Sequence, residues 1–202
     1  MLVLLLLNLS LPYTLAGEYS QSEQQTILIM GDSISAGFGI DKEQGWVSLL
    51  DIKLKTLAIP YKIINASISG ETTSGGANRI KPLLDKHNPN LVIIELGGND
   101  GLRGSPIRMM KQNLSYMIKQ SQNSGAKVLL LGMRIPPNYG QTYSNLFSGQ
   151  YKQLALEYNT LILPFLLNGI ATQTGMMQAD GIHPTAKAQP LMMEYVWSII
   201  KP

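Results

Sequence analysis

Five short runs of apolar residues, rich in leucine and isoleucine, recur along the chain. Runs of this length are typical of strands that are buried on both faces of a parallel sheet. The five predicted strands cover residues 26–30, 61–66, 91–96, 127–132 and 161–165.

The segments between these runs carry residues, most of them apolar, at helical spacing. The residues with this spacing are Trp46, Leu49, Leu50, Ile52, Lys53 and Leu57; Ile80, Leu83 and Leu84; Met109, Met110, Leu114, Met117 and Ile118; and Tyr151, Leu154, Ala155 and Tyr158. A last helix is predicted from about residue 185 to residue 200. We expect the methionine and aromatic side chains on these helical faces to pack in the core.

Strands that alternate with helices predict right-handed crossovers and a parallel sheet covered on both faces. The expected fold class is therefore α/β, a three-layer α/β/α sandwich around a five-stranded parallel sheet, with flavodoxin-like architecture. A chain of 202 residues with 45% hydrophobic and 14% charged residues is long and apolar enough for one sizeable core.

The first segment is uncharged, rich in leucine, and ends in Thr14-Leu15-Ala16, which resembles an export cleavage site. We interpret residues 1–16 as a signal peptide and residues 17–202 as a single domain, which predicts an exported protein, periplasmic or secreted. A membrane anchor is the alternative, but a spanning helix needs about 20 apolar residues. This run is shorter and is interrupted by Asn8, Ser10 and Pro12, so no stable membrane anchor is expected.

The composition limits the partners. The formal net charge is +3, and the lysines and arginines are scattered along the chain, which argues against nucleic-acid binding. The chain has no cysteine, so disulfides and a thiol nucleophile are excluded. No heptad pattern or long apolar stripe is visible, and we expect a monomer.

Candidate chemistry follows the first predicted strand directly, as Gly31-Asp32-Ser33-Ile34. Ser33 thus stands where parallel α/β sheets place their ligands. Near the other end of the chain, Asp180 precedes His183 by three residues, a spacing that lets one loop supply a base and the carboxylate that orients it. The only other histidine, His87, lies in a polar turn, residues 86–89. Ser33, His183 and Asp180 are therefore the candidate nucleophile, base and orienting acid.

Two further loops follow predicted strands, residues 65–71 and 97–104, and both contain glycine. Parallel strands end at one edge of a sheet, so these loops are expected to share a crevice with Ser33. An ester carbonyl attacked by a serine develops an oxyanion that needs fixed donors. The backbone N–H groups of Ser33 and Gly70 and the side-chain amide of Asn99 are the candidates.

Four blocks of sequence in this order resemble the SGNH hydrolases, the GDS(L) group, and among them the exported acyl-ester and thioester hydrolases of Gram-negative bacteria. The blocks are residues 31–34, 65–70, 95–104 and 180–184, and residues 44–46 and 137–140 are also similar. Ile34 replaces the leucine of the group's name, which is a volume-conserving exchange.

The resemblance implies an esterase and thioesterase that forms an acyl-enzyme on Ser33 and needs neither a metal nor an organic cofactor. Its substrate would be a small-molecule acyl ester or thioester. We expect Ile34, Leu102 and Ile135 to contact the acyl chain. Arg103 stays open between a solvated surface charge and a contact to an anionic head group.

Each residue also has a structural interpretation. Ser33 could cap a helix, although Asp32 is the better candidate for a cap, and Gly70 and Asn99 are common in turns. Two other functions compete with the first. One is an exported carbohydrate O-acetyl esterase on the same fold. The other is a non-catalytic flavodoxin-like binding module, which is disfavoured because the chain lacks the glycine-rich phosphate-binding motifs.

Overall fold

The computed structural model describes residues 24–201. The predicted signal peptide, residues 1–16, lies outside the described residues.

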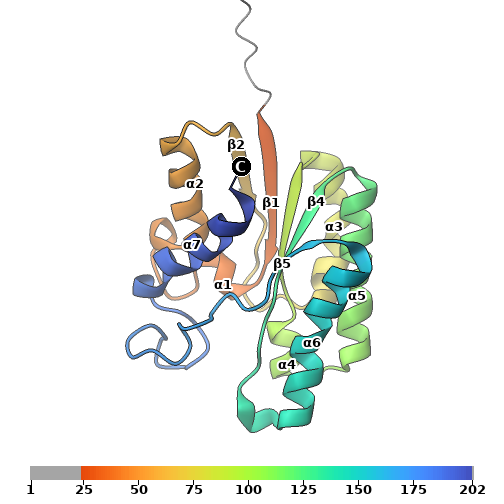
Figure 1. Ribbon diagram of the computed structural model, residues 1–202, viewed down its shortest axis with the longest axis vertical. Helices are drawn as coiled ribbons and strands as arrows, with labels where there is room; N and C mark the ends of the chain where they lie inside the picture. The colour runs from red at the N-terminus through yellow and green to blue at the C-terminus, as the bar shows by residue number, and fades with distance from the viewer. Residues whose placement is uncertain (1–23, 202) are drawn as a thin grey trace, which may run out of the picture.

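A five-stranded parallel sheet forms the centre of the fold, as predicted from the sequence (Figure 1). The structure gives the strand order as β2-β1-β3-β4-β5. The strands are β1 (Gln25–Gly31), β2 (Tyr61–Asn65), β3 (Leu91–Glu95), β4 (Lys127–Leu131) and β5 (Leu161–Leu163). The central strand β3 is buried along its whole length, whereas the edge strands β2 and β5 are only partly buried. This explains why β3 is almost wholly apolar in sequence.

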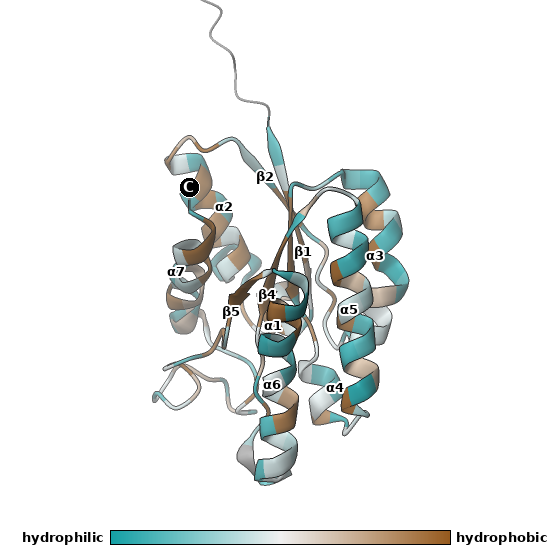
Figure 2. Ribbon diagram, turned by 45° about the vertical axis from the view of Figure 1, so that its right-hand side comes forward, coloured by the Kyte–Doolittle hydropathy of each residue, from teal (hydrophilic) through white to brown (hydrophobic). Residues whose placement is uncertain are grey.

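Helices cover both faces of the sheet, with α2 and α7 on one face and α3, α5 and α6 on the other (Figure 1). The α-helices are α1 (Ser33–Ala36), α2 (Trp46–Thr56), α3 (Thr73–His87), α4 (Gly98–Leu102), α5 (Ile107–Asn123), α6 (Gln141–Tyr158) and α7 (Gln189–Ile200). Three short 3₁₀ helices are η1 (Lys42–Gln44), η2 (Pro137–Tyr139) and η3 (Ala186–Ala188). The ribbon of the central strands is mostly hydrophobic, whereas α3 and α5 carry many hydrophilic residues (Figure 2).

The strand register aligns the loops that carry the candidate site. Gly31, the last residue of β1, pairs with Glu95, the last residue of β3. The loops after β1, β2 and β3 therefore leave the sheet at the same edge, which is the lower edge in Figure 1, where α1 and α4 lie. His87 ends α3 and so precedes β3, at the opposite edge.

Two details of the prediction were wrong. The last α-helix begins at Gln189 and not at residue 185, because a 3₁₀ turn (Ala186–Ala188) precedes it and Pro190 occupies its first turn, where proline is tolerated. Met109, a methionine expected in the core, is more than half exposed. Ile52 and Leu57, which share the helical spacing, are also more than half exposed. No helix within residues 24–201 is both long and apolar enough to span a membrane.

Two helical glycines provide a matched test of packing. A Cβ on Gly76, in α3, would lie 2.5 Å from Leu96 Cδ1 and 3.0 Å from Met117 Sδ, whereas one on Gly149, in α6, would meet no atom within 4 Å. We predict that Gly76→Ala lowers the free energy of unfolding by about 1–3 kcal/mol through overpacking. Gly149→Ala should raise it by about 0.5–1 kcal/mol through helix propensity. Urea denaturation measures both, and equal effects at the two sites would contradict the close packing of α3 on the sheet.

Candidate active site

The candidate nucleophile lies in the sharp turn between β1 and α1. Gly31 has no room for a side chain, because a Cβ there would lie 2.7 Å from Ser35 Cβ and 2.8 Å from Glu95 Oε2. Asp32 caps α1, and its Oδ1 accepts a hydrogen bond of 3.0 Å from the backbone N–H of Ile34. Ser33 is the first residue of the helix and does not cap it. The cap of α1 therefore does not use the Ser33 hydroxyl.

The candidate base comes from a long segment without helix or strand, between β5 and η3. An antiparallel bridge between Met177 and Pro184 closes this segment into a loop. Inside the loop, Asp180 Oδ1 accepts hydrogen bonds from the backbone N–H groups of Ile182 (2.9 Å) and His183 (3.0 Å). These bonds fix Asp180 relative to the imidazole of His183.

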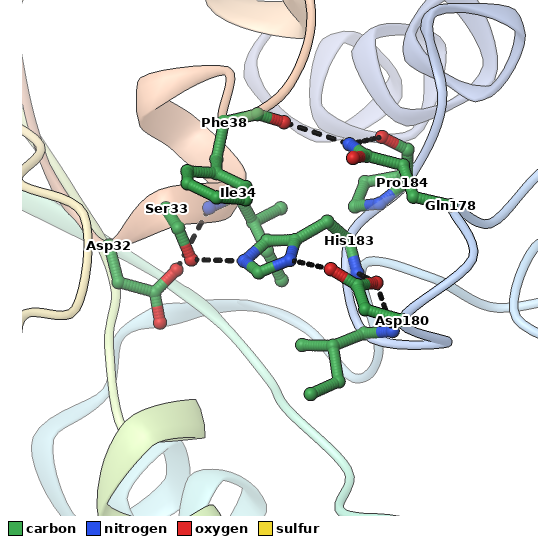
Figure 3. A network of polar contacts seen from close by, with 9 residues as sticks. Asp32, Ser33, Ile34, Phe38, Gln178, Asp180, His183 and Pro184 are labelled. Carbon is green, nitrogen blue, oxygen red and sulfur yellow. Dashed lines mark hydrogen bonds and ion pairs between the residues drawn. The ribbon is translucent and has the colours of Figure 1, made fainter.

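Three side chains from the two ends of the chain form one hydrogen-bonded series (Figure 3). His183 Nε2 lies 2.8 Å from Ser33 Oγ, and His183 Nδ1 lies 2.6 Å from Asp180 Oδ2. The hydrogen bond from His183, together with the two backbone N–H groups, lowers the pKa of Asp180 to about 2. Asp180 is therefore ionised at neutral pH. The ring of Phe38 lies over the imidazole, with 4.5 Å between the ring centroids.

Of the three candidate oxyanion donors, Ser33 and Asn99 line one cavity, whereas Gly70 lies in the loop between β2 and α3. Gly70 has a φ of +79°, which a glycine adopts readily. Within residues 24–201, the backbone N–H groups of Ser33 and Gly70 donate to no protein acceptor. The amide of Asn99 is already engaged, because its Nδ2 donates to Asp32 Oδ2 (3.1 Å) and to the backbone carbonyl of Glu71 (2.9 Å).

Arg103 makes a contact that is neither a solvated surface charge nor a contact to a head group. Its Nη2 donates a hydrogen bond of 3.1 Å to the backbone carbonyl of Gly70. The guanidinium therefore supports the loop that presents the Gly70 N–H group.

Sequence reasoning missed a buried carboxyl group directly behind the nucleophile turn. Glu95 is fully buried, and its Oε2 accepts hydrogen bonds from Ser35 Oγ (2.7 Å) and from the backbone N–H of Asp32 (3.3 Å). Its Oε1 has no partner among the described residues. Burial, and then the nearby charge of Asp32, raise the pKa of Glu95 well above its usual range. The signal was present, since an acid inside the apolar run 91–96 is unusual.

Asp32 has a raised pKa as well. Burial raises the pKa of Asp32 to about 6, although the hydrogen bond from the Ile34 N–H and the charge of His183 oppose the shift. Asp32 and Glu95 thus form a pair of desolvated carboxyl groups under Ser33, whereas Asp180 lies near the surface with its own donors.

A cavity of about 510 Å³ opens beside Ser33 and His183. Its walls are mostly apolar, and Ile34, Leu102 and Ile135 all line it. Other apolar wall residues are Met133, Phe165 and Leu167. The cavity therefore offers an apolar group a place next to the Ser33 hydroxyl. Within residues 24–201, no group of three or more His, Asp or Glu side chains is arranged to hold a metal ion.

A parallel α/β/α sandwich with a Ser-His-Asp series at the carboxyl ends of its strands is typical of a serine hydrolase. Comparison with known proteins gives the family. The model of the GDSL-like lipase/acylhydrolase family matches residues 29–190. The chain belongs to this family, and it is an esterase of the SGNH type.

Three curated relatives match over most of their length. The chain is 50% identical to esterase TesA of Pseudomonas aeruginosa over 182 residues, which cover 90% of each chain. It is 44% identical to an arylesterase of Vibrio mimicus over 95% of this chain and 94% of the relative. It is 38% identical to thioesterase 1/protease 1/lysophospholipase L1 of Escherichia coli over 88% of this chain and 84% of the relative.

Solved structures agree with these relatives. A crystal structure of TesA superposes with a TM-score of 0.86 at 50% identity and covers 88% of this chain and 99% of its own. The psychrotrophic esterase EstA from Pseudoalteromonas sp., in a structure inhibited by monoethylphosphonate, gives 0.84 at 43% identity and covers 88% and 97%. The predicted family resemblance is thus confirmed.

The buried Glu95 predicts a pH-dependent stability. Because the folded pKa of Glu95 is raised, its contribution to stability is complete below its unfolded pKa and is lost as pH rises through the folded pKa. Glu95→Gln removes this titration. We predict that the stability of the variant relative to the native chain is higher at pH 8 than at pH 4.5, because only the native chain keeps a buried carboxyl group that ionises as the pH rises. Urea denaturation at both pH values measures the difference.

The control for this prediction is Glu43→Gln, which removes a carboxyl group from an exposed position. Its stability relative to the native chain should change by much less between the two pH values. The same change for Glu43→Gln as for Glu95→Gln would contradict a special environment at Glu95.

Proposed function

We propose that this esterase hydrolyses carboxylic esters and thioesters of acyl chains through an acyl-enzyme on Ser33. The observation that carries the proposal is the series Ser33-His183-Asp180 at the mouth of an apolar cavity. The relatives are named as an esterase, an arylesterase and a thioesterase/lysophospholipase, which supports the same substrate class.

In the proposed reaction, Ser33 Oγ attacks the acyl carbon while His183 Nε2, 2.8 Å away, accepts its proton. Asp180, with a pKa of about 2, stays ionised and stabilises the imidazolium. His183 then protonates the leaving alcohol or thiol as the acyl-enzyme forms. In the second half of the cycle, His183 deprotonates a water molecule that attacks the acyl carbon, and it then returns the proton to Ser33 Oγ as the carboxylic acid is released. This sequence of proton transfers calls for no metal or organic cofactor.

The oxyanion of each tetrahedral intermediate would accept hydrogen bonds from the N–H groups of Ser33 and Gly70. Asn99 would be the third donor. Because both N–H bonds of its amide are engaged by Asp32 and Glu71, the oxyanion would share one of them in a three-centre bond. The existing contacts hold the amide in place before the substrate arrives, so no reorganisation is needed during the reaction.

The proposed substrate places its acyl chain in the 510 Å³ cavity, against Ile34, Leu102 and Ile135. An acetyl group would leave most of this apolar space empty, so the cavity favours longer acyl chains over the alternative of a carbohydrate O-acetyl esterase. We also propose that the protein is exported to the periplasm and works as a monomer on small-molecule substrates.

The nucleophile is tested by Ser33→Ala. We predict a loss of at least about 10³-fold in kcat on p-nitrophenyl butyrate and palmitoyl-CoA, because the three residues act as a unit. Ser198→Ala, an exposed serine on α7, is the control and should keep the native rate. Initial-rate assays on the purified proteins check both. A Ser33→Ala variant with more than a tenth of the native rate would refute the proposed mechanism.

The acyl site is tested by Leu102→Trp, which fills part of the cavity. We predict that kcat/KM on p-nitrophenyl decanoate falls at least about tenfold relative to p-nitrophenyl acetate, because a missing apolar contact of this size is worth about 1–3 kcal/mol. Leu146→Trp is the control, since Leu146 is more than half exposed and does not line the cavity. An unchanged ratio would place the acyl chain elsewhere. A strong preference of the native enzyme for acetylated xylan over decanoyl esters would instead favour the acetyl esterase.

A further inference from the structure

The position of His183 needs an explanation, because no helix or strand carries it. Residues 164–185, between β5 and η3, contain only turns and the single bridge between Met177 and Pro184. Such a segment has few backbone hydrogen bonds to hold it against the rest of the fold. Yet the imidazole must stay within hydrogen-bond reach of Ser33 throughout the reaction.

Gln178 connects this loop to the nucleophile segment (Figure 3). Its side-chain Nε2 donates hydrogen bonds to the backbone carbonyls of Phe38 (2.8 Å) and Pro184 (3.0 Å). Its backbone N–H donates to the carbonyl of His183 (2.7 Å). One residue therefore binds both the residue after the base and the segment that follows α1.

The nucleophile segment is shaped to receive this amide. The backbone N–H of Phe38 donates to the carbonyl of Ser33 (3.0 Å), so the carbonyl that Gln178 binds is tied directly to the nucleophile. Gly39 has a φ of +73°, and a Cβ there would collide with Oε1 of Gln178. The ring of Phe38 meanwhile packs over the imidazole of His183.

The link is independent of the reacting atoms. Among the described residues, only two hydrogen bonds join residues 31–40 to residues 176–184, and the other is Ser33 Oγ to His183 Nε2. That second bond disappears when Ser33 is acylated, because its hydroxyl proton has gone and its oxygen is esterified. In the acyl-enzyme, the amide of Gln178 is then the remaining hydrogen bond between the two segments.

We propose that Gln178 is a positioning residue that keeps His183 aligned over the Ser33 ester during deacylation. It touches neither the substrate nor the reacting atoms, and acts through Phe38 and the loop of His183. During acylation the Ser33 hydroxyl itself helps to hold the imidazole, so loss of the amide matters less in that step. This inference rests on the proposed acyl-enzyme on Ser33.

The test is Gln178→Met, which keeps the length of the side chain and removes the donor. With p-nitrophenyl butyrate, the decay of the acyl-enzyme should slow about tenfold, the scale of one lost positioning hydrogen bond, while its formation slows less than about threefold. In steady state, kcat and KM fall together wherever deacylation limits turnover. Stopped-flow bursts and mass spectrometry of quenched samples measure the two steps.

Gln173→Met is the matched control, because Gln173 lies in the same loop with an exposed side chain and should leave both rates unchanged. Gln178→Glu, which is close in shape and has no amide donor, serves as the second variant if the Met variant does not fold. It should show the same selective slowing of decay.

Two results would overturn the proposal. One is an unchanged decay rate in the variants. The other is equal slowing of formation and decay with a lowered melting temperature, which is the result of a purely structural role. Both differ from failure of the proposed function, in which native enzyme and Ser33→Ala hydrolyse the ester at similar rates and no acyl-enzyme is detected.

Discussion

The site depends on the hydrogen bond of 2.8 Å between Ser33 Oγ and His183 Nε2. Its two partners are 150 positions apart in sequence, so the fold has to bring two distant segments together. A hydrogen bond tolerates only a few tenths of an ångström of error. The parallel sheet positions Ser33, since its register brings the loops after β1, β2 and β3 to one edge. His183 lies in an irregular loop, which is positioned by side-chain and turn contacts.

The carboxyl groups around this bond are placed in opposite environments. Asp180 lies near the surface, accepts three hydrogen bonds and remains charged, which suits a group that stabilises an imidazolium. Glu95 and Asp32 lie beneath the nucleophile, where burial favours their neutral forms. The buried pair binds the N–H groups and the hydroxyl that shape the turn, at the cost of desolvation. Burial of these two carboxyl groups thus lowers the free energy of unfolding at the turn that must be rigid.

The sheet could be predicted from the sequence, and so could the place of Ser33 at a strand end and of Asp180 and His183 in one loop, because each rests on a local signal. Apolar runs mark buried strands, and strand ends mark ligand sites. The roles of Glu95 and Gln178 could not be predicted, because each depends on contacts to residues at least 60 positions away. The exposure of Ile52 and Leu57 has the same cause, since helical spacing defines a face but not what covers it. The start of α7 depends on a 3₁₀ turn that spacing does not reveal.

A few hydrogen bonds connect the three loops that carry the candidate oxyanion donors. The turn that presents the Ser33 N–H is capped by Asp32 Oδ1, while the other oxygen of the same carboxyl group holds the amide of Asn99. Arg103 holds the carbonyl of Gly70 from the outside. Asp32 therefore links two of the three candidate donors. This double task gives a reason for the position of Asp32 under the nucleophile in spite of its desolvation, because its two oxygens bind the turn after β1 and the loop after β3 at once.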